Sequence, residues 1–84
     1  MQLSVELTLY PLQDHYLDII KAVIEKLNTY DNVEVSTFPT ATILIGEYGV
    51  VMTALTDVIA WSYEEYGKCA FVAKFLPAYE ARLT

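Results

Sequence analysis

The fold of this chain is decided by the stretch SVELTLYPL, residues 4–12. Apolar and polar residues alternate strictly up to Pro11, and successive side chains of a β-strand point to opposite faces of its sheet. The pattern therefore predicts a strand that buries one face in a core. Its other face would present a row of polar side chains from Ser4, Glu6, Thr8 and Tyr10. This row predicts that the second face of the sheet is a binding or assembly surface.

Hydrophobic periodicity predicts two helices and three more strands after this one. The expected elements are a helix over residues 15–27, a hairpin of strands 33–38 and 41–46, a helix from Gly49 to Gly67, and a strand over residues 69–76. We expect Asp14 to be the N-cap of the first helix and Gly67 to cap the C-terminus of the second.

The order βαββαβ is that of the split βαβ or ferredoxin-like plan, an α+β fold. Right-handed crossovers would place both helices on one face of a four-stranded antiparallel sheet with strand order 4-1-3-2. A chain of 84 residues is long enough for one small core. We therefore expect a single ferredoxin-like domain over residues 1–84, with the other face of its sheet uncovered.

Composition excludes several classes of protein. Apolar residues make up 55% of the chain, which is unlike a disordered protein, and the net charge of −6 argues against nucleic-acid binding. We see no signal peptide and no stretch apolar enough to insert in a membrane. Cys69 is the single cysteine, which fits a reducing compartment, and we expect a cytoplasmic protein. Because so small a domain buries a limited part of its surface, we also expect an oligomer.

A candidate ligand site follows from the uncovered face of the sheet. In the predicted topology Glu6 would be flanked by Thr42 and Lys74, close to the aromatic rings of Tyr10 and Phe38. Such a group could clamp a flat polar heterocycle. The alternative is that Glu6 and Lys74 form only a cross-strand ion pair at a subunit interface. The other residues expected on this face are Glu34, Ser36, Leu44 and Val72.

No catalytic or metal-binding constellation is indicated. His15 directly follows Asp14, but adjacent residues on a helix do not face each other. One histidine and one distant cysteine do not make a metal site. We therefore expect no enzyme, no metal and no cofactor.

The segment ELTLYPL at residues 6–12, with Thr42 and Gly46 in the hairpin and Lys74 in the last strand, resembles the YkoF-like thiamine- or hydroxymethylpyrimidine-binding domains. It is also similar to the related small thiamine-binding-like proteins. The similarity covers about residues 3–77. It implies a ferredoxin-like domain that associates into dimers or tetramers and binds thiamine or its pyrimidine half without chemistry. The positions that match the family's pattern are Glu6, Thr8, Tyr10, Thr42 and Lys74.

Two residues depart from that pattern. Gln13 stands where related sequences usually have glycine, and Ile45 stands where many have an acidic residue. The second change removes a possible acceptor for the amino group of the pyrimidine.

The expected function is that of a non-enzymatic binding protein for thiamine or hydroxymethylpyrimidine, in transport, buffering or sensing. Glu6 is assigned to the pyrimidine end of the ligand, with Tyr10 or Phe38 against its ring. Two alternatives stay open. One is a dimeric αβ-barrel-type enzyme acting on a small aromatic substrate, and the other is an assembly or regulatory module whose open face is consumed by the interface.

Overall fold

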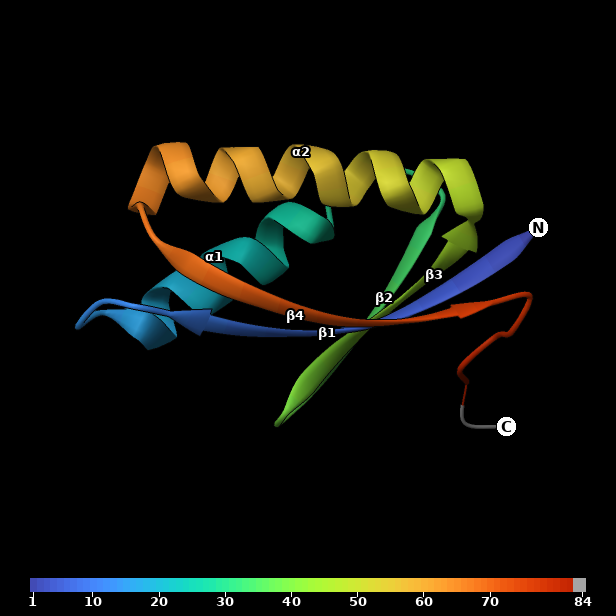
Figure 1. The fold of residues 1–84 in the computed structure, drawn as a ribbon, viewed down its shortest axis with the longest axis horizontal. Coiled ribbons are helices and arrows are strands. Elements are labelled where there is room, and N and C mark those ends of the chain that lie inside the picture. Colours follow the sequence, from blue (N-terminus) through green and yellow to red (C-terminus); the bar gives the residue numbers. More distant parts are fainter. Residues whose placement is uncertain (83–84) are drawn as a thin grey trace.

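The computed structural model describes residues 1–82 and contains the predicted order of elements. These are β1 (Gln2–Pro11), α1 (Tyr16–Leu27), β2 (Val33–Phe38), β3 (Ala41–Glu47), α2 (Tyr48–Tyr66) and β4 (Cys69–Pro77). The strands form one antiparallel sheet in the order β2-β3-β1-β4, and both helices cover the same face of it (Figure 1). The predicted ferredoxin-like fold is confirmed, because 4-1-3-2 is the same order viewed from the other edge.

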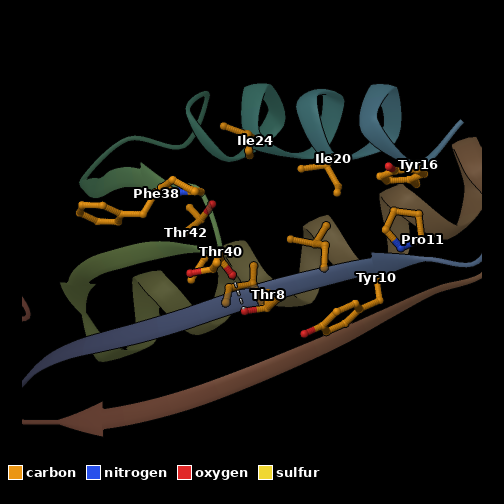
Figure 2. A pocket seen from close by; sticks show the side chains of 13 residues that line it. Thr8, Tyr10, Pro11, Tyr16, Ile20, Ile24, Phe38, Thr40 and Thr42 are labelled. Atoms are coloured by element: carbon orange, nitrogen blue, oxygen red, sulfur yellow. Dashed lines mark hydrogen bonds between the residues drawn. The ribbon is translucent and has the colours of Figure 1, made fainter.

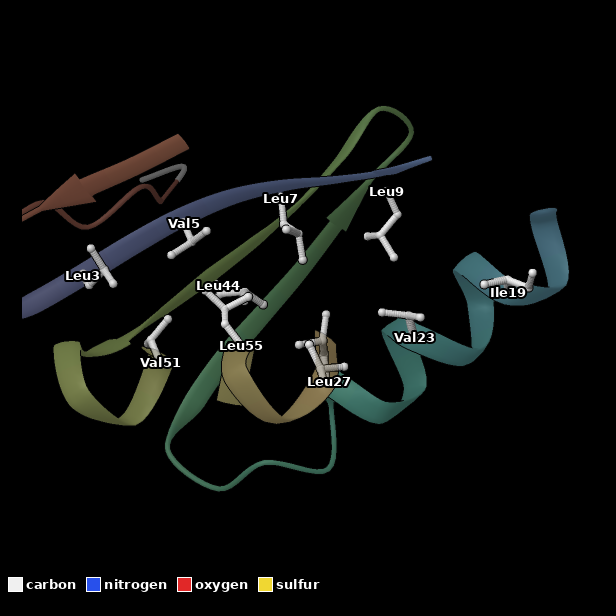
Figure 3. Close-up of a cluster of buried hydrophobic side chains, with 11 residues drawn as sticks. Leu3, Val5, Leu7, Leu9, Ile19, Val23, Leu27, Leu44, Val51 and Leu55 are labelled. Atoms are coloured by element: carbon white, nitrogen blue, oxygen red, sulfur yellow. The ribbon is translucent and has the colours of Figure 1, made fainter. Parts of the chain in front are cut away.

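The alternating stretch of β1 lies at the centre of the core. Its four apolar side chains are buried and point toward the helices (Figure 3); they are Leu3, Val5, Leu7 and Leu9. They pack against buried side chains of both helices, which are Ile19, Val23, Leu27, Val51, Leu55 and Val58. Full burial of one such side chain stabilises the fold by about 1.5–3 kcal/mol. The hydrophobic side of β1 therefore decides which face of the sheet the helices cover.

The two helices begin in different ways. The N-cap of α1 is His15, which makes no capping side-chain hydrogen bond, so the prediction of Asp14 as the N-cap is wrong. The helix starts one residue too late for the Asp14 carboxylate to serve its first amides. By contrast, the Glu47 carboxylate caps α2 and accepts hydrogen bonds from the backbone N–H groups of Gly49 and Val50, at 3.0 and 3.3 Å. In residues 1–82, neither helix is both long and apolar enough to cross a membrane.

Residues 78–82, here called the strap, cross the face of the sheet opposite the helices (Figure 1). The Ser4 hydroxyl donates a hydrogen bond to the carbonyl oxygen of Tyr79 at 2.6 Å and accepts one from the Ala81 N–H at 2.9 Å. Ser4 is 0% exposed as a result. The expected row of polar side chains on this face therefore begins at Glu6, because the chain's own C-terminal segment covers its first member.

An ion pair holds the far end of the strap. The Arg82 guanidinium lies 2.6 Å from Oε1 of Glu34 on β2, and it also pairs with Glu80. The strap thus reaches from β4 at one edge of the sheet to β2 at the other. Hydrogen bonding by Arg82 lowers the pKa of Glu34 below its ordinary value of 4.5.

We predict that Ser4→Ala loosens the strap, because the substitution removes one acceptor and one donor at once. A net loss of about 1 kcal/mol is expected, which lowers the melting temperature by roughly 4–8 °C. Thermal unfolding should show this loss, and amide hydrogen exchange should show faster exchange at Ala81. Ser36→Ala is the matched control, since Ser36 has no side-chain hydrogen bond within residues 1–82. Slow exchange at Ala81 in the variant would contradict the role given to Ser4.

The Glu34–Arg82 pair predicts a small acid-dependent loss of stability. Because the pKa of Glu34 is lowered in the folded protein, its contribution is complete above the unfolded pKa and is lost as the pH falls from about 4.5 through the folded pKa. Both side chains are exposed to solvent, so salt should weaken the effect. Urea unfolding of the wild type and Glu34→Gln across the acid range measures it. Identical pH dependence of the two proteins at low salt would contradict this prediction.

Candidate functional site

The register of the sheet separates the predicted site residues onto two faces. Directly opposite residues of an antiparallel pair point to the same side, and Thr42 lies opposite Leu7, whose side chain is in the core. Leu44 likewise lies opposite Val5. Both residues therefore face the helices, and the prediction that they lie on the open face is wrong. The sequence of β3 is apolar on both sides, so its alternation does not reveal which side enters the core.

Glu6 and Lys74 lie opposite each other on the open face, as predicted. Lys74 Nζ is 3.7 Å from Glu6 Oε2, and both side chains are well exposed. The other neighbour of Glu6 is Ile43, not Thr42. An exposed pair of this kind contributes roughly 0–1 kcal/mol. The predicted clamp of Glu6, Thr42 and Lys74 around one ligand is therefore not assembled.

A pocket of about 390 Å³ lies where β1 runs past the end of the β2–β3 hairpin, and we call it the notch (Figure 2). Pairing of β1 with β3 stops at Leu7 and Thr42, whereas pairing of β1 with β4 continues to Pro11 and Cys69. The end of β1, the hairpin turn and α1 therefore enclose a gap. The residues that line it are Leu7, Thr8, Leu9, Tyr10, Pro11, Tyr16, Ile20, Ile24, Phe38, Pro39, Thr40, Ala41 and Thr42.

Four of the six predicted ligand contacts line the notch, namely Thr8, Tyr10, Phe38 and Thr42. Glu6 and Lys74 do not. Sequence reasoning missed the wall made by α1, because it placed the site on the face of the sheet that the helices leave open. One signal was available: the first strand reaches Pro11, which is farther than the neighbouring hairpin strand can accompany it.

The walls of the notch are mostly apolar and uncharged. No carboxylate, ammonium, guanidinium, imidazole or thiol is among the lining groups. Tyr10 and Tyr16 approach from opposite sides of β1 (Figure 2), and Phe38 is 43% exposed at the hairpin end. The Thr8 hydroxyl donates a hydrogen bond to the carbonyl oxygen of Thr40 at 3.2 Å. Apolar and aromatic walls with a few polar groups are typical of sites for flat organic ligands.

Thr42 carries the unused polar group of the notch. Its residue is 3% exposed, yet its hydroxyl has no hydrogen-bond partner within residues 1–82. No sealed polar side-chain atom in that part of the chain lacks a partner, so the hydroxyl is reached from the notch. A threonine hydroxyl can donate one hydrogen bond and accept others. It is therefore available to a ligand that enters between β3 and α1.

The titratable groups with shifted pKa values on the helix side of the sheet lie outside the notch. Burial and the hydrogen bond to Asp57 raise the pKa of Tyr30 to about 12. Lys26 Nζ lies 5.6 Å from the ring centroids of both Tyr30 and Trp61. Burial raises the pKa of the Cys69 thiol, which disfavours the reactive thiolate. No group of three or more His, Cys, Asp or Glu residues in the described part of the chain could hold a metal ion.

The two departures from the family pattern also lie outside the notch. The Gln13 side-chain amide donates a hydrogen bond to the carbonyl oxygen of Tyr66. Ile45 is buried on the strap side of the sheet, opposite Ser4 and Glu34. Neither residue lines the notch, so neither changes its chemistry directly.

Solved structures share this architecture. Protein SP2199 from Streptococcus pneumoniae is 25% identical, with a TM-score of 0.84 over 94% of this chain and 89% of that chain. Protein TM0486 from Thermotoga maritima, proposed to act in thiamine biosynthesis or salvage, is 16% identical, with a TM-score of 0.81 over 96% and 86%. The hypothetical protein MJ1052 from Methanocaldococcus jannascii is 19% identical, with a TM-score of 0.78 over 99% and 87%. No curated protein matches the chain.

The model of one protein family, the YKOF-related family, matches residues 2–71. The match begins with β1 and ends within β4, so it includes every residue that lines the notch and leaves out Lys74 and the strap. It confirms the resemblance that the sequence motifs indicate. The chain belongs to the YKOF-related family.

Proposed function

We propose that the protein binds thiamine or its hydroxymethylpyrimidine moiety in the notch, for transport, buffering or sensing. Membership of the YKOF-related family supports this, as does the fold shared with the Thermotoga maritima protein. The observation that carries the proposal is the notch itself. It combines a volume of about 390 Å³, within the range of small-molecule sites, with aromatic rings and the buried, unpartnered hydroxyl of Thr42.

The proposed ligand contacts are Thr8, Tyr10, Phe38 and Thr42. The pyrimidine ring would lie against the apolar walls, with its polar groups toward the threonine hydroxyls. The cationic ring of thiamine would lie at the mouth, where the faces of Tyr10 and Phe38 attract a positive charge. The net charge of −6 favours the approach of such a cation. Glu6 is held in its ion pair outside the notch, so it has no contact with the pyrimidine in this arrangement.

Binding without chemistry is part of the proposal. General acid–base and nucleophilic catalysis depend chiefly on carboxylate, imidazole, ammonium or thiol groups close to the reacting atoms. The lining of the notch contains none of these. Its hydroxyls and aromatic rings are suited to holding a ligand and fixing its orientation.

A thermal-shift titration tests the proposal. Thiamine or hydroxymethylpyrimidine at 100 times its dissociation constant should stabilise the protein by about 2.7 kcal/mol, which raises the melting temperature by several degrees. Phe38→Ala should reduce this shift, because it removes an aromatic wall of the notch. Phe75→Ala is the matched control, since Phe75 is similarly exposed, at 47%, but does not line the notch. Absence of a shift with both compounds would reject the proposed function.

We propose further that the working unit is a homodimer or homotetramer joined through β4. This strand forms one edge of the sheet over nine residues, and Val72 and Phe75 expose 57% and 47% of their surface along it. Long apolar edge strands pair readily with another strand, and Lys74 is the only charged residue in this one. A second copy would complete the hydrogen bonds of the edge and cover these side chains.

Sedimentation velocity should therefore show a dimer or tetramer. Val72→Asp should shift the protein toward monomer, because it places a charge in the proposed contact. Thr53→Asp, at an exposed position of α2, is the control and should leave the association unchanged. A wild-type protein that sediments as a monomer at all concentrations would reject the assembly.

A further inference from the structure

The main chain of β1 is unpaired on one side where it borders the notch. From Thr8 to Pro11 this strand pairs with β4 only, because its pairing with β3 ends at Leu7. In an antiparallel ladder, the N–H and C=O groups of successive residues point alternately to the two neighbouring strands. Two of the residues 8–11 must therefore direct their amide groups toward the side that β3 has left.

Both possible registers leave a donor and an acceptor together. If the residues that point to this side are Leu9 and Pro11, Leu9 supplies an N–H and a C=O, and Pro11 supplies a second C=O. If they are Thr8 and Tyr10, Tyr10 supplies the N–H and C=O pair. All four residues line the notch. In either case one residue presents N–H and C=O side by side, in the plane of the sheet.

These groups need partners that the apolar walls do not offer. Unpaired backbone N–H and C=O groups are costly when they are removed from water. A rigid ring with an acceptor and a donor on adjacent atoms of one edge, as in an aminopyrimidine, satisfies both at once. Such a ring would extend the ladder of β1 in place of the missing strand, much as peptides do when they add to a sheet edge.

We infer that the notch reads an uncharged heteroaromatic ring through the main chain of β1. The free N–H and C=O pair with an adjacent acceptor and donor of the ring, and the Thr42 hydroxyl pairs with a further polar group of the ligand. Because no charged side chain lines the notch, a phosphate ester of the same ring would lose its hydration without compensation and is rejected. This inference rests on the proposed function and specifies which part of the ligand enters the notch.

Calorimetric titration with three probes tests the inference: hydroxymethylpyrimidine, its analogue with hydrogen in place of the amino group, and its phosphate ester. The parent compound should bind at least tenfold more tightly than either of the others, since each lacks a satisfied polar contact. Thr42→Val should weaken binding of the parent compound by about tenfold. Thr37→Val is the matched control, because Thr37 lies opposite Thr42 in the hairpin but does not line the notch.

A measurement on the wild type reports the main-chain contact directly. In a ¹⁵N-labelled sample, the amide proton of Leu9 or Tyr10 should shift downfield and exchange more slowly when hydroxymethylpyrimidine is bound. This readout does not depend on whether any variant folds. Binding with both amide signals unmoved, or equal affinity for the amino and des-amino rings, would overturn the inference and leave the proposed function standing. Failure of every pyrimidine to bind would overturn both.

Discussion

The pairing of β1 stops at different points on its two sides, and the functional features of this protein depend on that offset. β4 accompanies the strand to Pro11, whereas β3 leaves it after Leu7. A fully paired strand would have no main-chain groups to offer and no space beside it. The short hairpin leaves both, and α1 covers the helix side of the gap so that it becomes a pocket and not an open edge.

The two ends of the sheet are finished in different ways. At one end the strap lies over the face that the helices leave open, and it uses the Ser4 hydroxyl and the Glu34 carboxylate as its attachment points. This explains why Ile45 is apolar on a face that would otherwise meet water. At the other end no strap is present within residues 1–82, and the polar and aromatic side chains of β1 and β2 stay accessible around the notch.

The character of the notch follows from the elements that form it. Its walls come from the core side of the sheet and from the inner face of α1, which are apolar because they belong to the folding core. Polar groups can enter such a place only as hydroxyls or as main chain. A site built in this way selects a neutral ring by shape and by a few hydrogen bonds, and it leaves charge to the mouth. Membership of the YKOF-related family is in keeping with a small organic ligand of that kind.

The sequence by itself determined the order of elements, the sheet topology and the buried side of β1, because strict alternation and helical periodicity identify a core face without tertiary information. It also placed Thr8, Tyr10 and Phe38 in one neighbourhood. Only the tertiary structure decided that Thr42 faces α1, because β3 is apolar on both sides and its register comes from pairing with β1. The strap was equally hidden, since the hydrogen bonds of Ser4 join residues about 75 positions apart in the chain, and local patterns carry no signal of contacts at that separation.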